Sequence, residues 1–413
     1  MKDPYTLHTL DNGLRVVIEV MPDVCSAAAG FLARTGARDE TPKLAGVSHF
    51  LEHMMFKGTA KRDWRKITID FDNMGSSYNA FTSEERTFYY GWVRRSDIGK
   101  QIELLADMMR SKLPTGEFDM ERNVILEEIA MSKDHLEHVA YDFILEKIFG
   151  EHPLGWPVLG YQHTVEPMDR DRMMEYFRQR YAPDNLMLIV AGNVDPDEII
   201  AMAREHCGSW EPSGIRRDRI RPTFRSGTEV SVTDRFNQQF VAITFPSVGS
   251  NHEFTETAEA ASAILGGGNS RFFWNIVQTG ISPRTSVYHV QYEDCGLMLL
   301  CGVCQPENSE KFLDAMRAEA DQICREKVQP REIERVKNRR RTSLAVGAEA
   351  PYHRLTQVME DMDTRGAPRT VDQMLADIDT VSADSVEAYF EQYPINIPGH
   401  LSSVGPRDWP KDQ

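Results

Sequence analysis

The chain of 413 residues has few cysteines, no long apolar run and a deficit of positive charge. Six cysteines without dense spacing do not form the disulfide framework of a secreted domain, so reduced thiols in a cytoplasmic protein are expected. No apolar run approaches the ~18–20 residues that span a bilayer, and the first residues lack the apolar core of a signal peptide. With 47 Lys and Arg against 63 Asp and Glu, the net charge of -16 argues against nucleic-acid binding. These absences predict a cytoplasmic location and partners that are neither nucleic acid nor membrane.

The chain repeats itself once. Three pairs of like residues lie 213 positions apart, namely Gly36 and Gly249, Tyr176 and Tyr389, and Gly192 and Gly405. Alternating strand patterns occur in both halves, together with amphipathic helices that we predict at 98–112, 119–148 and 309–327. The sequence therefore predicts an α+β fold of two homologous domains, each an antiparallel-rich sheet packed with long helices.

The predicted domains cover residues 1–210 and 229–413. Residues 211–228 between them carry Pro, Gly and several Arg with little periodicity, which is typical of a linker. We interpret the arginines of this linker as a solvated strap.

The segment His49-Phe50-Leu51-Glu52-His53 carries the sharpest chemical signal. His49 and His53 are four residues apart on a predicted helix, so both imidazoles project from one face at the spacing that two ligands of one zinc require. Glu52 falls on the same side, where its carboxylate can accept a proton from an attacking water molecule. The pattern H-x-x-E-H is the inverse of the zincin pattern H-E-x-x-H. Two histidines packed on an apolar helix are the alternative interpretation.

A catalytic zinc needs three protein ligands and one open position, so a third ligand must come from another segment. Glu121 and Glu128 are seven residues apart on a predicted helix and share a face, whereas Glu127 points away. We predict Glu128 as the third ligand and Glu121 as the residue that orients a ligating imidazole. His135 and His138 form a rival pair, but their polar, solvated surroundings argue against a metal role.

Four stretches together resemble the pitrilysin–insulysin family of inverzincin metallopeptidases, in the branch of the mitochondrial processing peptidase and its bacterial relatives. Residues 49–59 resemble the family's signature helix, 79–90 its active-site edge strand, 121–128 its distal-glutamate helix and 152–160 the loop that follows. The likeness spans nearly the whole chain, and the duplicated domain resembles the family's two-domain half-clamshell.

The resemblance implies a zinc endopeptidase with one Zn2+ per chain. By position, His49, His53 and Glu128 would hold the zinc and Glu52 would be the general base. The resemblance also implies that a peptide substrate lies as an added strand along Asn79, Ala80, Phe81 and Thr82. Such main-chain pairing binds extended peptides without dictating their sequence.

The second copy departs from the first, because Ser262, Leu265 and Gly266 stand where the first has His49, Glu52 and His53. We therefore expect one metal-binding catalytic domain and one support domain without metal.

A second departure concerns the Arg and Tyr, seven residues apart, that hold the substrate backbone in complete members of the family. Gln278 and Thr285 align with that pair, and neither supplies a cationic or phenolic donor. Arg284 and Tyr288 lie close by and would replace the pair if the register were shifted. Otherwise the resemblance implies a heterodimer in which a homologous subunit without zinc supplies the Arg/Tyr side. The substrates are expected to be short unstructured peptides cleaved inside a closed chamber.

The competing hypothesis is a non-catalytic scaffold subunit of the same fold. Such relatives typically lose members of the set formed by the two histidines, Glu52 and Glu128. The full set is present in this chain, and no structural role requires a general base beside two ligands.

Overall fold

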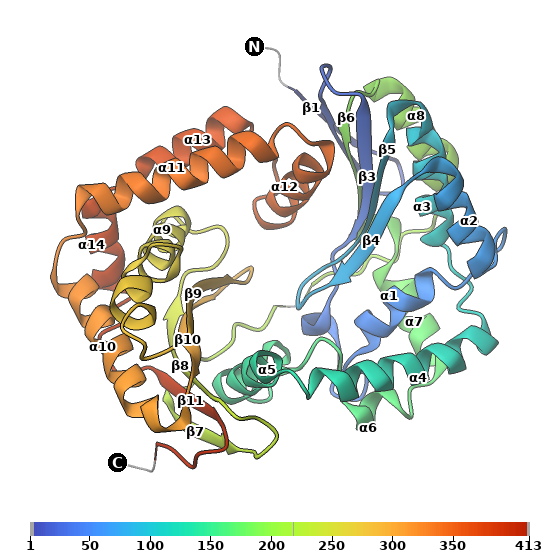
Figure 1. Cartoon of the computed structure of the whole chain (residues 1–413). Helices are drawn as coiled ribbons and strands as arrows, with labels where there is room; N and C mark the ends of the chain where they lie inside the picture. The colour runs from blue at the N-terminus through green and yellow to red at the C-terminus, as the bar shows by residue number, and fades with distance from the viewer. Residues whose placement is uncertain (1–3, 218, 411–413) are drawn as a thin grey trace. The chain divides into compact units, whose positions relative to one another are not determined.

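The computed structural model describes residues 4–217 and 219–410. The chain divides into two compact units, each built around one β-sheet (Figure 1). Unit 1 consists of Met1–Ala130, Trp156–Arg219 and Ala345–Thr370, and unit 2 of Met131–Gly155, Ile220–Leu344 and Val371–Gln413, within the described residues.

The sheet of unit 1 has six strands. Their order is β1 (Tyr5–Thr9), β2 (Arg15–Val20), β6 (Leu186–Gly192), β3 (Ser26–Ala33), β5 (Thr87–Arg94) and β4 (Ser77–Thr82). Only β2 and β6 run parallel, and the other neighbours are antiparallel. The central strands β3 and β6 are almost entirely apolar and buried, as a sheet covered on both faces requires. Among the described residues, β4 forms one edge of the sheet, with no strand on its outer side.

Within the described residues, the sheet of unit 2 repeats this arrangement without a counterpart of β1. Its order is β7 (Gly227–Val232), β11 (His400–Gly405), β8 (Gln239–Ser247), β10 (Gly296–Cys304) and β9 (Arg284–Gln291), with β7 and β11 parallel. A tyrosine hydroxyl fixes the same corner in both units: Tyr176 lies 2.7 Å from the Thr35 hydroxyl, and Tyr389 lies 2.7 Å from the Ser247 hydroxyl. The predicted α+β class, with two antiparallel-rich sheets packed with helices, is confirmed.

Most helices belong to the same compact unit as the sheet of their own half of the chain. In the first half they are α1 (Val47–Met55), α2 (Trp64–Met74), α3 (Ile98–Met108), α4 (Thr115–Ser132), α5 (Leu136–Phe149), α6 (Gln162–Val165), α7 (Arg170–Arg180) and α8 (Pro196–Cys207). In the second half they are α9 (Thr255–Gly266), α10 (Ser309–Arg325), α11 (Pro330–Gly347), α12 (Pro351–Thr364), α13 (Val371–Thr380) and α14 (Ala383–Gln392). None of these helices combines the length and apolar character that crossing a membrane requires.

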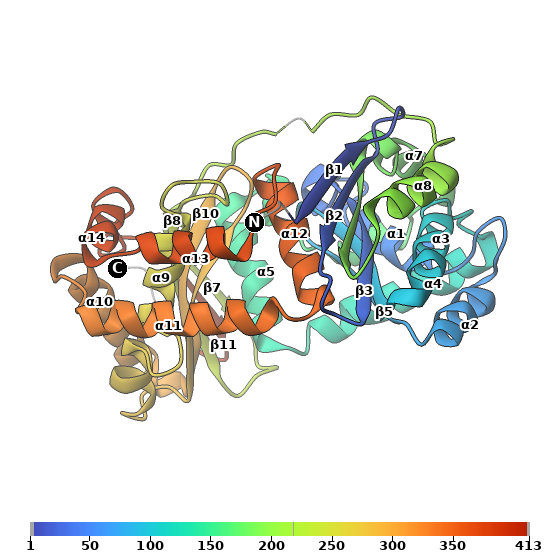
Figure 2. The same ribbon diagram turned by 90° about the horizontal axis from the view of Figure 1, so that it is seen from above.

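Two helices pack on the sheet of the other half. The apolar residues of α12, such as Leu355 and Met359, pack on β3 and β6 of unit 1 (Figure 2). The Arg354 side chain of α12 also donates to the buried Glu19 carboxylate of β2 at 3.0 Å. Conversely, α5 packs its apolar side on the sheet of unit 2. The compact units are therefore discontinuous in sequence, whereas the predicted domains 1–210 and 229–413 are contiguous. The boundaries of the two predicted domains describe the homologous copies and stay a prediction.

The single helix predicted over 119–148 is wrong. The chain forms α4 and α5, with a turn at residues 133–135 between them. Ile125 and Ile129 of α4 belong to the core of unit 1, whereas Ile144 and Ile148 of α5 belong to a cluster in unit 2. Because the two apolar faces serve different cores, one continuous helix does not satisfy both.

The interpretation of the linker arginines as a solvated strap is also wrong for two of them. Residues 211–217 and 219–226 form neither helix nor strand. However, the side chains of Arg217 and Arg219 are only 8% and 13% exposed and lie near the acidic residues Asp39 and Glu85 of unit 1. Sequence charge alone did not reveal these distant acidic partners.

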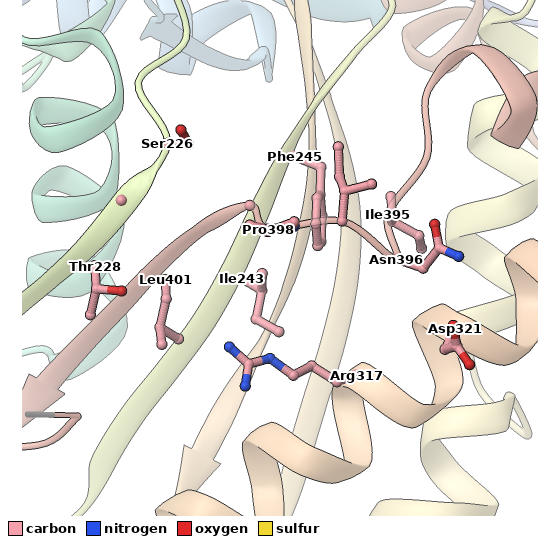
Figure 3. A pocket seen from close by; sticks show the side chains of 13 residues that line it. Ser226, Thr228, Ile243, Phe245, Arg317, Asp321, Ile395, Asn396, Pro398 and Leu401 are labelled. Carbon is pink, nitrogen blue, oxygen red and sulfur yellow. The ribbon is translucent and has the colours of Figure 1, made fainter. Parts of the chain in front are cut away.

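Unit 2 has no counterpart of α8 within the described residues. In unit 1, α8 packs on β2 and α3, and the Trp210 ring that follows it lies 5.9 Å from the Phe31 ring. Ile243 occupies the equivalent of Phe31, because the two residues pair with Leu401 and Leu188 respectively. Ile243 lines a cavity of about 550 Å³ into which Arg317 of α10 extends (Figure 3).

Candidate metal centre

Helix α1 carries both histidines of the motif, and its first turn is fixed by a buried carboxylate. The backbone N–H groups of Gly46 and Ser48 each donate to the Glu40 carboxylate at 2.7 Å. Gly46 has φ 93, and a Cβ there would lie 2.7 Å from the Leu159 carbonyl oxygen, so glycine is required. Burial raises the pKa of Glu40 to about 8, although the two backbone hydrogen bonds oppose that rise. The orientation of α1, and with it the direction of its imidazoles, is therefore set by contacts at its start.

Three side chains from α1 and α4 converge. His49, His53 and Glu128 each present a ligand atom, and these atoms all lie within 4.8 Å of one another. The Nε2 atoms of His49 and His53 lie 3.8 and 3.7 Å from Oε2 of Glu128. Zinc bonds of about 2.0–2.1 Å at tetrahedral angles place ligand atoms roughly 3.4 Å apart. The spacing therefore fits one zinc ion between the three residues.

The protonation of His49 also fits a metal ligand. Burial, together with the neighbouring His53, lowers the pKa of His49 to about 3, so its imidazole is neutral near pH 7. A neutral imidazole is the form that binds metal. The Nδ1 atom of His49 is buried and has no hydrogen-bond partner among the described residues.

The second histidine is oriented from behind by an acidic residue of α4. Nδ1 of His53 lies 2.8 Å from Oε1 of Glu121, and Nζ of Lys57 lies 2.6 Å from Oε2 of the same carboxylate. Burial alone would raise the pKa of Glu121, but the hydrogen bonds from His53 and Lys57 lower it overall. An ionised Glu121 keeps the proton of His53 on Nδ1 and leaves Nε2 directed toward Glu128.

Glu52 lies on α1 between the two histidines and contacts the edge strand. The Thr82 hydroxyl, at the end of β4, donates to Oε2 of Glu52 at 2.5 Å. Burial raises the pKa of Glu52, and the Thr82 hydrogen bond and the nearby His53 only partly offset that rise. A carboxylate with a raised pKa beside a candidate metal position has the properties of a proton acceptor.

The four residues of the predicted substrate strand lie on β4. Asn79, Ala80, Phe81 and Thr82 pair with β5 on one side, and the other side of β4 is the edge of the sheet. Within the described residues, no further strand pairs with this side of β4, and the strand ends at Thr82 next to Glu52.

The rival histidines are not part of such a cluster. In the part of the chain that the structure describes, His49, His53 and Glu128 are the one group of three or more side chains placed to share a metal ion. His138 instead lies 3.5 Å from Asp142 on α5, and His135 is the N-cap of that helix.

The residues singled out in the second copy lie in unit 2. Ser262, Leu265 and Gly266 are on α9, where Ser262 and Leu265 are buried. Gln278 follows a short helical turn, and Thr285 lies on β9. Arg284 forms an ion pair with Glu137 of α5, and the Tyr288 side chain is half exposed on β9.

Sequence analysis did not identify Glu40 or Lys57. Lys57 has a local signal, since it lies four residues after His53, one helical turn further along. Glu40 precedes its helix by several residues, and only the folded loop shows that its carboxylate reaches the first turn.

Comparison with known proteins identifies the family of the chain. The family model "Insulinase (Peptidase family M16)" matches residues 15–162, and the model "Peptidase M16 inactive domain" matches residues 167–340. An uncharacterized zinc protease of Streptomyces coelicolor is 33% identical over 96% of this chain and 89% of its own length. The uncharacterized zinc protease YmxG of Bacillus subtilis is 30% identical over 93% of this chain and 94% of its own length.

Solved structures show the same fold at lower identity. A protease from Helicobacter pylori superimposes with a TM-score of 0.91 at 18% identity, covering 97% of this chain and 99% of that one. A chain of complex III2 from Candida albicans gives a TM-score of 0.85 at 17% identity, covering 98% and 97%. The two family models and the relatives confirm the resemblance seen in the sequence: the chain belongs to peptidase family M16.

Proposed function

We propose that this chain is a zinc-dependent endopeptidase of the inverzincin type, with one zinc ion per chain, that cleaves short unstructured peptides. The observation that carries the proposal is the convergence of His49, His53 and Glu128 beside the buried carboxylate of Glu52. The donor set of two imidazoles and one carboxylate matches the ligand chemistry of a catalytic zinc site with one open position.

Each residue of the site has a distinct role in this proposal. Zinc, when bound, polarises the scissile carbonyl group and lowers the pKa of a water molecule. His49, His53 and Glu128 hold the ion, while Glu121 keeps His53 in the correct tautomer through the bond at 2.8 Å. Glu52 accepts a proton from the attacking water and passes it to the leaving amine.

Thr82 orients Glu52 for these proton transfers. Its hydroxyl holds one carboxylate oxygen at 2.5 Å, so the other oxygen is left to receive the proton. Since Thr82 is also the last residue of β4, a peptide added along Asn79–Thr82 would meet the general base at the end of the strand. Pairing through the main chain selects extended, unstructured peptides rather than folded proteins.

The active form in this proposal is a heterodimer with a homologous subunit that lacks zinc. The supporting observation is the pair Gln278 and Thr285, which offers no cationic or phenolic donor where complete relatives have Arg and Tyr. Arg284 is paired with Glu137 within unit 2, which argues against its serving as a replacement. The sister subunit would supply both donors to a shared closed chamber, in the cytoplasm.

The alternative, a non-catalytic scaffold, is supported by the fold-level likeness to a chain of complex III2. The intact set of two histidines, Glu52 and Glu128 favours the enzyme, because a scaffold has no use for a buried proton acceptor beside metal ligands.

The proposal is tested with Glu52→Gln in the full chain. The variant should retain zinc, because the three ligands are untouched, and should lose peptide cleavage. Activity is measured on unstructured fluorogenic peptides, with the chain alone and mixed with a candidate homologue without zinc. Glu127→Gln is the matched control, since Glu127 is an exposed acid beside Glu128. Cleavage by E52Q at the wild-type rate in the active mixture would disprove the role of Glu52.

A further inference from the structure

A cluster of charged side chains surrounds the turn that joins β4 to β5. The turn consists of residues 83–86, directly after Thr82. The arginine cluster, as we call it, consists of Arg34, Arg38, Asp39, Glu85, Arg86, Arg180, Arg217, Arg219 and Asp363. Its acidic members are almost completely buried, with 3% of the Asp39 and Asp363 side chains exposed and 5% of the Glu85 side chain.

Arg217 brings the linker into this cluster. Its guanidinium donates to the Arg34 carbonyl oxygen at 3.0 Å and to the Glu85 carbonyl oxygen. The same group lies 3.8 Å from the carboxylates of Asp39 and Asp363. A planar guanidinium with several donors can bind main chain and carboxylates at once, which a lysine cannot reproduce.

The turn is also held by main chain on its other side. The N–H groups of Ala37 and Arg38 donate to the carbonyl oxygens of Ser83 and Glu84 at 3.2 and 2.7 Å. Gly36 permits this approach, since a Cβ there would lie 2.3 Å from the Ser83 carbonyl oxygen. The Ala37–Arg38 segment and Arg217 therefore hold three successive carbonyl groups of the turn.

The geometry points to Arg217 as a positioning residue for the edge strand and, through Thr82, for Glu52. This inference rests on the proposed function and extends it, because it assigns to the linker a part in substrate binding. The contacts form a continuous path in which Arg217 fixes Glu85, the turn fixes the end of β4, and Thr82 holds Glu52 at 2.5 Å. The path lies entirely within unit 1.

Loss of the Arg217 side chain should loosen β4 without disturbing the metal ligands. The ligands lie on α1 and α4, and none of them contacts the turn through the bonds described above. An edge strand paired on one side only depends on its turn for register, so substrate pairing along β4 should weaken first. The expected kinetic signature is a raised KM with a smaller change in kcat.

The test compares Arg217→Ala, Arg217→Lys and Arg216→Ala in the full chain loaded with zinc, and KM is measured after mixing each variant with the homologue without zinc. Arg216 is the matched control, because it is the exposed neighbour of the same charge. Amide hydrogen exchange of Ser77–Thr87 should be about tenfold faster in R217A, and KM for a fluorogenic peptide about tenfold higher, with R217K intermediate. Zinc content and exchange in β2 and β6 should stay as in the wild type, and R216A should match the wild type throughout.

Two results would overturn the inference. One is a folded R217A whose β4 exchange and KM equal those of the wild type. The other is faster exchange across the whole sheet of unit 1, which indicates general destabilisation instead of positioning. If the wild type cleaves no peptide even when mixed with the homologue without zinc, the proposed function fails, and hydrogen exchange alone then decides whether Arg217 positions the turn.

Discussion

Replacing Glu121 tests how much the metal centre depends on a residue that does not touch the metal. Glu121 is 6% exposed, and its carboxylate binds Nδ1 of His53 at 2.8 Å and Nζ of Lys57 at 2.6 Å. Glu121→Gln keeps the size of the side chain but removes its charge, so the bond that fixes the His53 tautomer weakens and Lys57 loses its counter-ion. Partners of this kind contribute about 10–100-fold to metal affinity. We therefore expect a loss of about 1.4–2.8 kcal/mol in zinc binding.

The affinity is measured by zinc competition with a chromophoric chelator at constant pH. Glu127→Gln is the control, because Glu127 is exposed on the same helix and adjacent to Glu128. It should bind zinc as tightly as the wild type, while Glu121→Ala should bind at least as weakly as E121Q. Equal affinity of E121Q and E127Q would refute the idea that the Glu121 carboxylate supports His53.

Three further predictions concern protonation and folding. Burial raises the pKa of Glu40 from 4.5 to about 8, so between these pH values the folded state binds a proton that the unfolded state releases. The free energy of unfolding should therefore fall as pH rises from about 4.5 to about 8. Urea titrations of Glu40→Gln should show a pH slope that is smaller by up to about 1.4 kcal/mol per pH unit. The Thr82 hydrogen bond lowers the pKa of Glu52, so Thr82→Val should raise this pKa and move the acidic limb of the kcat/KM profile to higher pH, and an unmoved limb would contradict the contact. Zinc at about 100 times its Kd should stabilise the wild type by about 2.7 kcal/mol in thermal unfolding, and His53→Ala should abolish the effect.

Local spacing was sufficient to group the residues of the candidate metal centre. A helix places residues four and seven apart on one face, so the spacing alone orients the pair His49 and His53 and the pair Glu121 and Glu128. The folded chain brings these two faces together. The duplication likewise followed from repeated residues, and it corresponds to two sheets that share the order of five strands.

Contacts between distant segments were beyond sequence reasoning. The packing of α12 on β3 and β6 joins residues about 160 or more positions apart, and periodicity shows only that α12 has an apolar face. In the same way, the composition of the linker predicted solvated arginines. The buried acidic partners Asp39 and Glu85 come near Arg217 and Arg219 only in the folded chain. The contact between Thr82 and Glu52 depends on how the edge strand meets α1, which no local pattern encodes.

The proposed metal centre requires three side chains of unit 1 to hold a single zinc ion. Elemental analysis of the purified full chain, compared with His49→Ala, measures this zinc content. We predict about one zinc per wild-type chain and none in H49A, since two remaining ligands do not retain a catalytic zinc. A wild-type chain without zinc after purification in zinc-supplemented buffer, or an H49A variant with undiminished zinc, would contradict the assignment.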